Sequence, residues 1–303
     1  MGLPNESGDL LSKMDSDASR RLFPLRFYES HLSISTRPDG RPLKSAREAF
    51  VGPGDVASAD GSAMTKIGST TMLAAIKMEI MTPSADKPDE GSIAVEFYMP
   101  PICSPLVRPG RPAEIAPVIS KQLYDTIMSS GMIDLKELSL ISGKAAWMVY
   151  LDIYCLDADG ALFDAALYSA AAAFSFLQIP VVSLSEEGRL TIIPEEGNGN
   201  KSDKDVVNKG KRKLTISSLP FSLTCGLHKN YILPDPTSEE ETLMETFVTV
   251  VLNSSGHLVS LYKPGGPVLA QTSTIQDCIA LTRQRMTDLQ KSLDEAITEM
   301  KVD

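Results

Sequence analysis

The chain has 303 residues, of which 43% are hydrophobic and 22% are charged. This composition excludes bulk disorder and is sufficient for one large core or two fused smaller ones. The formal net charge of −10 is also the wrong sign for a stand-alone nucleic-acid binder, because neutralising phosphates requires clustered Lys and Arg. Any contact with RNA would therefore depend on a local basic patch.

No targeting or membrane segment is evident. Residues 1–7 contain neither the basic nor the apolar region of a secretory signal. The longest apolar stretch, residues 165–176, is too short to cross a bilayer. We therefore expect a soluble protein of the cell interior that makes no contact with a membrane.

The cysteines and histidines are scattered along the chain. Cys103, Cys155, Cys225 and Cys278 are far apart in sequence and form no C-x-x-C motif, which argues against a structural zinc site. We expect buried free thiols in a reducing compartment. The three histidines are equally dispersed, so the sequence predicts no metal site and no cofactor.

The first half of the chain predicts strands with a helix between them. After a disordered segment at 1–15, residues 16–35 have the pattern of a helix, and Arg37-Pro38-Asp39-Gly40-Arg41 is typical of a turn. Residues 63–66, 70–80 and 92–99 have strand character, with a hairpin-like exposed loop at 83–91.

A predicted helix then opens at Pro112, runs to Ser130 and is closed by Gly131. Strands at 135–142 and 147–156 follow, and a turn at 157–160 leads into an Ala-rich helix, residues 161–177.

The second half begins with a change of composition. Residues 195–212 are polar and Gly-rich, which predicts a flexible insertion. The neighbouring basic run at 209–213 has two interpretations, a solvated loop or a nuclear-localisation or RNA-contacting patch. Strands at 221–227, 247–253 and 257–262 precede a final amphipathic helix at 273–300.

Strands grouped between long helices indicate an α+β fold of mixed sheets with helices packed on them. We divide it into a first half, 16–183, and a second half, 184–303.

Common catalytic motifs are missing from the sequence: it contains no P-loop, no G-x-G-x-x-G, no H-E-x-x-H and no G-x-S-x-G. The aspartates at 157, 159 and 164 surround a Gly turn, where Asp is common for local hydrogen bonding, and we assign no metal to them. The acidic run 235–241 has two interpretations. It is either a capped helix N-terminus, favoured by the helix dipole, or a carboxylate cluster that holds Mg²⁺ for phosphoryl transfer.

Five motifs, in this order along the chain, resemble RNase PH-type subunits of the RNA exosome over about residues 20–290. They are Arg37-Pro38-Asp39-Gly40-Arg41, the segment 59–63 with 68–70, the segment 103–112, Leu156-Asp157-Ala158-Asp159-Gly160 with its Ala-rich helix, and Asp235-Pro236-Thr237 with Glu239-Glu240-Glu241. The subclass with Asp-Pro-Thr and a Glu triplet is similar to the ring subunits that lack activity.

The resemblance implies an RNase PH-like fold of two β-α units that are similar to ribosomal protein S5 domain 2, and a ring of six such domains. It also implies the partners: other RNase PH-like ring subunits, cap subunits with S1 and KH domains, and RNA threaded through the ring. The role would be support of 3′-to-5′ processing and degradation, in rRNA maturation and mRNA turnover. The expected locations are nucleus, nucleolus and cytoplasm.

The resemblance further implies that no catalytic residue is retained. Active relatives hold phosphate with an Arg at the start of the Ala-rich helix, but the matching segment 160–164 has no Arg, and we expect Asp164 to repel phosphate. Active relatives also carry two Asp residues six positions apart. Their equivalents here are Glu241 and, within about one residue, Phe247, so one carboxylate is missing.

Arg108 and Arg111 match positions at which active relatives grip the RNA backbone. Such a contact needs only charge and reach, so we predict that both bind RNA. The alternative is that both form salt bridges with neighbouring subunits. Two rival functions also stay open: a phosphorolytic 3′-to-5′ exoribonuclease with a degenerate site, and an adaptor outside RNA metabolism.

Overall fold

The computed structural model of the chain describes residues 18–54, 56–184, 190–192, 212–267 and 270–299. The predicted disorder at 1–15 and most of the predicted insertion at 195–212 lie outside these ranges. Of the basic run at 209–213, only Arg212 and Lys213 are described, and they form the short exposed strand β10. Within the described ranges, no helix combines the length and apolarity that a membrane span requires.

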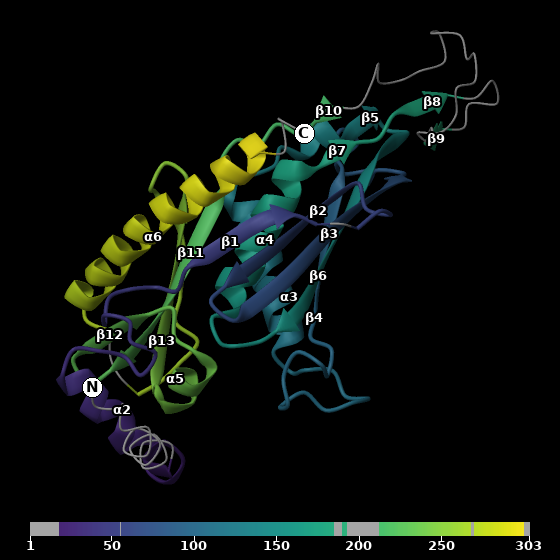
Figure 1. Cartoon of the computed structure of the whole chain (residues 1–303). Helices are drawn as coiled ribbons and strands as arrows, with labels where there is room; N and C mark the ends of the chain where they lie inside the picture. The colour runs from purple at the N-terminus through teal and green to yellow at the C-terminus, as the bar shows by residue number, and fades with distance from the viewer. Residues whose placement is uncertain (1–17, 55, 185–189, 193–211, 268–269, 300–303) are drawn as a thin grey trace, which may run out of the picture.

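A six-stranded sheet forms the first half of the fold (Figure 1). Its strands are β1 (Ala49–Pro53), β2 (Gly61–Ile67), β3 (Thr70–Met81), β4 (Ser92–Tyr98), β5 (Ser139–Ile141) and β6 (Ala145–Asp157). The order is β1-β2-β3-β6-β4, with β5 paired to the end of β6. Since β4 lies parallel to β6 and on its far side from β3, the segment 83–91 links strands that are not neighbours. The prediction of a hairpin-like loop there was wrong.

Helices cover one face of this sheet, and the side chains that point to that face are buried. In β3 and β6 every second side chain is buried, as a half-exposed strand requires. α4 (Leu162–Phe176) packs on β2 and β3, and α3 (Ala116–Ser130) packs on β4. α4 is rich in alanine and nearly all of it is buried, which lets it lie between two sheets.

A second, four-stranded antiparallel sheet covers the other side of α4. It has the order β12-β11-β13-β14 and is made of β11 (Pro220–His228), β12 (Tyr231–Pro234), β13 (Thr246–Asn253) and β14 (Leu258–Tyr262). Every residue of β11 is buried. The reason is that two helices contact this strand, α4 and the last helix, α6 (Thr272–Glu299). The main hydrophobic cluster is continuous across both halves, since it includes residues of α4, β11 and α6.

The remaining strands are short pairs. β7 (Gln178–Ile179) pairs with β10 (Arg212–Lys213), and β8 (Val182–Leu184) pairs with β9 (Leu190–Ile192). They lie at the end of the molecule where the described part of α6 also ends (Figure 1). The four cysteines are free and buried, as predicted.

Several predicted boundaries were wrong for identifiable reasons. α3 begins at Ala116 instead of Pro112, and Pro117 occupies its first turn. Residues 135–138 form a 3₁₀ helix, η1 (Leu135–Leu138), whose cap is the Asp134 side chain accepting from Lys136 N–H, so only the last part of the predicted strand 135–142 is a strand. The predicted helix at 16–35 is interrupted at Phe23, after which α2 (Pro24–Ser33) begins at a proline.

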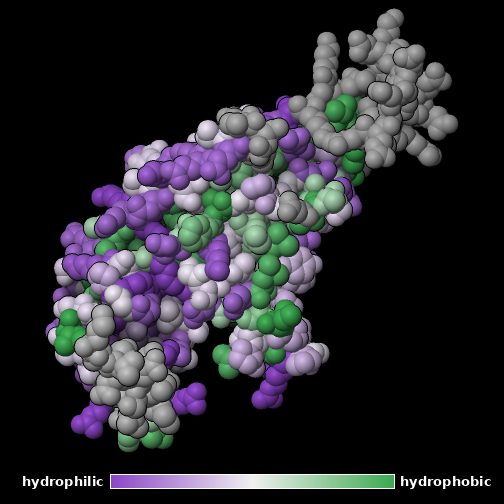
Figure 2. All heavy atoms as spheres, in the orientation of Figure 1, coloured by the Kyte–Doolittle hydropathy of each residue, from purple (hydrophilic) through white to green (hydrophobic). Residues whose placement is uncertain are grey.

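α6 spans almost the predicted range, and its buried face includes one arginine. The buried residues are Cys278, Thr282, Arg285, Leu289, Leu293 and Ala296. Met286 is half-buried and packs against the core beside this face, and an arginine, Arg285, lies in the middle of the buried residues. The outer side of α6 is hydrophilic (Figure 2).

Candidate functional site

A buried network of ion pairs joins the segment before β1 to the segment after β12. Arg37 Nε donates to Glu240 Oε1 at 2.9 Å, and its Nη1 donates to the Pro234 carbonyl at 2.7 Å. Arg37 and Glu240 are each only 1% exposed. Because one partner alone would be a buried uncompensated charge, this pair fixes the two segments relative to each other.

Arg47 and Asp235 form the second pair of the network. The Asp235 carboxylate accepts from the Arg47 backbone N–H at 2.7 Å, from Nε at 2.9 Å and from Nη2 at 2.6 Å. Burial alone would raise the pKa of Asp235, but the hydrogen bonds and positive charge of Arg47 outweigh it and hold that pKa below its usual value. Asp235 is therefore an anchoring carboxylate.

The Glu triplet belongs to a short helix, α5 (Ser238–Leu243), that closes one side of the site. Thr237 and Glu240 form a reciprocal capping box at its start, which confirms the helix N-terminus interpretation of the acidic run. Glu239 accepts from Arg20 and from the Tyr28 hydroxyl, and so attaches α2 to α5. Among the described residues no group of three or more His, Cys, Asp or Glu could hold a metal ion.

Gly160 brings the turn before α4 against the start of α5. Its φ is +74°, and a Cβ there would lie 2.3 Å from the Pro236 carbonyl oxygen, so only glycine fits without displacement. Beside it, Asp159 accepts from the Ser238 N–H at 3.2 Å and from the Ser238 hydroxyl at 3.1 Å. Its own carbonyl accepts from Arg47 Nη1 at 2.6 Å. Asp159 thus joins the turn to α5 and to the segment before β1.

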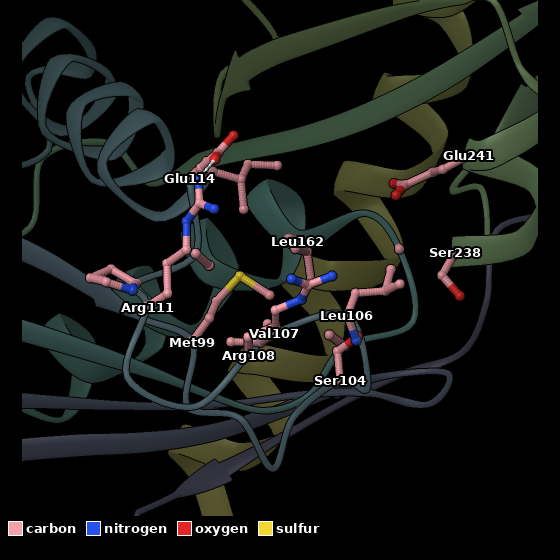
Figure 3. A pocket seen from close by; sticks show the side chains of 15 residues that line it. Met99, Ser104, Leu106, Val107, Arg108, Arg111, Glu114, Leu162, Ser238 and Glu241 are labelled. Carbon is pink, nitrogen blue, oxygen red and sulfur yellow. Dashed lines mark hydrogen bonds and ion pairs between the residues drawn. The ribbon is translucent and has the colours of Figure 1, made fainter.

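A cleft of about 410 Å³ lies where this turn, α5 and the loop between β4 and α3 meet. The loop supplies Arg108 and Arg111, α5 supplies Ser238 and Glu241, and the start of α4 supplies Leu162. Figure 3 shows Glu241 and Ser238 on the side opposite the loop residues. The structure therefore brings together the two predicted RNA-binding arginines and the carboxylate that the sequence aligned with a catalytic Asp.

Glu241 is the carboxylate that reaches this cleft from α5. Its Oε1 accepts from the backbone N–H of Ala161, at the start of α4, at 2.8 Å. Burial raises the pKa of Glu241 to about 6, against the lowering effects of that hydrogen bond and of the Arg47 charge. The carboxylate therefore occupies part of the positive end of α4.

The two arginines differ in their surroundings. Arg111 forms an exposed ion pair with Glu114, three residues on, whereas no described carboxylate pairs with Arg108. Both line the cleft, Arg108 nearer its centre in Figure 3. An exposed ion pair holds its partners weakly, so both guanidinium groups are accessible to a phosphate. Whether they bind RNA stays a prediction, and so does the alternative of salt bridges to other subunits.

Asp164 does not line the cleft. The prediction that its side chain repels phosphate there was therefore wrong. It is 6% exposed, and its carboxylate accepts from the Ser222 hydroxyl and from the Thr224 N–H, each at 2.6 Å. Burial raises the pKa of Asp164 to about 6, although these hydrogen bonds oppose the shift. The residue joins α4 to β11.

Phe247, the position aligned with the second carboxylate, lies away from the cleft. It packs against a separate apolar cluster of Leu32, Leu233 and Met244. Arg47 was not predicted from the sequence, although it contacts Asp159, Gly160 and Asp235 at once. No local pattern distinguishes that arginine from an exposed one, because its partners are 112 and 188 residues away.

Comparisons with known proteins agree with this geometry. Residues 45–180 match domain 1 of the RNase PH, 3′ exoribonuclease family, and residues 218–285 match domain 2. The chain is 30% identical over 266 residues to "Exosome complex component rrp43" of Schizosaccharomyces pombe, covering 88% of this chain and 93% of that protein. It is 32% identical over 227 residues to "Exosome complex component Rrp42" of Methanopyrus kandleri, covering 75% of this chain and 79% of that protein.

Solved structures give the same result for the fold. A chain of the Archaeoglobus fulgidus exosome, solved with RNA bound to the active site, superposes with a TM-score of 0.74 at 27% identity, covering 92% of this chain and 98% of that one. Rice Rrp46 superposes with a TM-score of 0.63 at 17% identity, covering 86% of this chain and 100% of that one. The α+β, RNase PH-like fold expected from the sequence is thereby confirmed.

Proposed function

The chain belongs to the RNase PH family of 3′ exoribonucleases, and we propose that within this family it is a non-catalytic subunit of the RNA exosome ring. It contributes to the wall of the RNA path while neighbouring subunits supply any catalysis. Its partners are other RNase PH-like subunits, S1 and KH cap subunits, and RNA. In this role it supports rRNA maturation and mRNA turnover.

The observation that carries the proposal is the composition of the cleft. Its lining includes two carboxylates, Glu114 and Glu241, and each already has a partner within the chain. Glu114 pairs with Arg111, and Glu241 accepts from the Ala161 N–H. The segment 160–164 that opens α4 has no arginine. A phosphorolytic enzyme needs an anion clamp and an acid or metal-holding group, and losing each commonly costs orders of magnitude in rate.

Arg108 and Arg111 support the RNA-path part of the proposal. Phosphate contacts that are independent of sequence need charge and reach, and both side chains meet the requirement at the cleft rim. The overall charge of −10 makes such a local patch necessary for any RNA contact. The same proposal locates the protein in nucleus, nucleolus and cytoplasm, which fluorescence imaging of the tagged full chain would test.

The first experiment is native mass spectrometry of the complex that the tagged chain forms in its own cells. A hetero-oligomer of different RNase PH-like chains with S1 and KH proteins is expected. A homohexamer would refute the ring-subunit assignment. Stable partners that include no exosome protein would favour an adaptor outside RNA metabolism.

RNA contact is tested on the assembled complex with the double variant Arg108→Ala/Arg111→Ala. Crosslinking of single-stranded RNA to this subunit should fall while assembly is unchanged. The salt dependence of binding should also become shallower, by about 0.7 in d log K/d log[salt] for each phosphate that is no longer neutralised. Arg283→Ala, which removes an exposed arginine of α6, is the matched control. Equal crosslinking in the double variant and the control would refute the RNA-path role.

A second candidate, a phosphorolytic exoribonuclease with a degenerate site, is favoured by one observation: a carboxylate with a pKa raised to about 6 lies across the cleft from an arginine. This candidate predicts phosphate-dependent release of nucleoside diphosphates from RNA by the purified full chain, abolished in Glu241→Gln. We expect no such release from either form.

A further inference from the structure

An arginine lies in the middle of the buried face of α6. Arg285 follows Cys278 and Thr282 and precedes Leu289 and Leu293 on that face, and it is 9% exposed. An apolar side chain at this position would complete the stripe that packs on β11 and β13. Burial lowers the pKa of Arg285, and nearby carboxylates, Asp235 foremost, offset only part of that shift.

Unlike Arg37 and Arg47, Arg285 has a guanidinium nitrogen that is not satisfied within the described part of the chain. Its Nη2 atom is shielded from solvent and has no hydrogen-bond acceptor among the residues that the structure describes. Arg37 and Arg47, at similar burial, are bound by Glu240 and by Asp235. A buried charge without a hydrogen-bonded counter-charge is strongly unfavourable, so the environment of Arg285 is incomplete without an anion.

Arg285 lines a small cavity between α6, the segment 44–46 that leads to β1, and the strands β11 and β12. Figure 1 shows α6 lying beside β11. The volume is about 90 Å³, well above the roughly 10–15 Å³ that one water molecule needs. Ser45 and Gln284 supply polar groups at its surface. It shares no lining residue with the cleft that contains Arg108 and Glu241.

The charges around the cavity favour a small anion. Lys44 is exposed at its rim and adds a second positive charge, while Asp288 adds a negative one. Asp235 is already bound to Arg47, and Asp164, another carboxylate near Arg285, accepts from Ser222 and Thr224. Among the lining residues, Arg285 therefore keeps a buried N–H donor that has no acceptor among the described residues.

We propose that this cavity is a binding site for a small tetrahedral oxyanion, with inorganic phosphate as its physiological ligand. Arg285 supplies the planar fork of donors that matches two oxygens of such an anion. Lys44 supplies a mobile charge at the entrance, and Ser45 and Gln284 supply neutral hydrogen bonds. The site is separate from the cleft, and the proposal does not depend on the ring assignment.

The test is equilibrium dialysis of the full chain, in the assembly that it forms, against radiolabelled inorganic phosphate at constant ionic strength. We expect Arg285→Met, which keeps an unbranched apolar stem and removes the guanidinium charge, to weaken binding at one site per chain by about tenfold or more. Lys44→Gln should weaken it less. Arg283→Met, an exposed arginine of the same helix, is the matched control and should bind phosphate as the unaltered protein does.

Unlabelled sulfate should compete for the site, since it has the same shape and charge type, whereas chloride at equal ionic strength should not. Equal phosphate binding by Arg285→Met, Arg283→Met and the unaltered protein would overturn the proposal. If Arg285→Met fails to fold, Lys44→Gln decides the matter, because Lys44 is exposed and its replacement leaves the core intact. Unchanged binding in that variant would also overturn it.

Discussion

The pairing of Arg47 with Asp235 is a buried link between the two halves of the chain, and Asp235→Ala tests its contribution directly. The substitution removes three hydrogen bonds that the carboxylate accepts from Arg47, which is 7% exposed. Removing one partner of a buried pair leaves the other charge uncompensated, which costs about 3–5 kcal/mol. We therefore expect the free energy of unfolding of the full chain to fall by that amount.

The measurement is urea unfolding followed by circular dichroism and by fluorescence of the single tryptophan, Trp147, which is fully buried in β6. Coincidence of the two transitions tests whether a two-state treatment is valid. The matched control is Asp125→Ala, which removes an exposed ion pair with Lys121 four residues away in α3. Such a surface pair contributes about 0.3–0.5 kcal/mol, so the control should unfold almost as the unaltered protein does.

Replacement of both partners separates the cost of an orphaned charge from the contribution of the pair. Arg47→Met/Asp235→Leu removes both charges, and swapping a buried ion pair for apolar groups is often close to neutral. The double variant should therefore recover part of the stability that Asp235→Ala loses, but not all of it, because Arg47 also donates to Asp159 and the φ of +51° at residue 235 disfavours Leu. A loss below about 1 kcal/mol in Asp235→Ala, comparable with the Asp125→Ala control, would refute the assignment of this pair as the link.

Two further predictions concern the cleft. Glu241→Gln keeps an acceptor for the Ala161 N–H and removes the carboxyl group. In the folded state the pKa of this carboxyl group is raised from 4.5 to about 6. The penalty of that buried charge is present above pH 6 and absent below the unfolded pKa. The variant should therefore be more stable by at most about 2 kcal/mol at pH 7.5, with the difference vanishing near pH 4.5 in pH-dependent thermal melts; a gain independent of pH would contradict the assignment. Gly160→Ala should lower the free energy of unfolding, measured in urea, by about 3 kcal/mol. The added Cβ would collide with the Pro236 carbonyl oxygen, and the φ of +74° is itself unfavourable for alanine. Gly110→Ala, with a φ of +78° and open space around it, should lose only about 1 kcal/mol, and equal losses would mean that the close approach is unimportant.

The sequence predicted the elements with strong local signals. The Ala-rich helix, the C-terminal helix and the strands β2, β3, β4 and β13 lie close to their expected positions, because their apolar periodicity is set by burial on one face. The αL cap at Gly131 was also predicted correctly, with a φ of +64°. The order of the strands was beyond local patterns. β4 and β6 are parallel, so a long crossover connection must join them. Contacts between residues far apart in sequence decide such a pairing, and local patterns do not record them.

The candidate site could be predicted in part. Arg108, Arg111 and Glu241 were singled out from the resemblance, and the fold brings them to one cleft. Asp164 was assigned the wrong surroundings, because a helix position tells which residues share a face but not which neighbour covers it. Arg285 escaped notice for a related reason. An arginine within an apolar stripe is normally interpreted as an exposed residue one position out of phase, and only the packing of α6 on β11 identifies it as buried.

Three acidic residues of the second half, Asp235, Glu239 and Glu240, act as structural anchors. Asp235 is bound to Arg47, Glu239 to Arg20, and Glu240 to Arg37. Each of these arginines comes from the first 47 residues, so the anchors attach the start of the chain to the second half of the fold. A carboxylate that is already held by an arginine or a backbone N–H is a poor general base and a poor metal ligand. A chain under selection to keep its shape within an assembly, but not to cleave RNA, would retain such anchors, and this supports a scaffolding role for the chain.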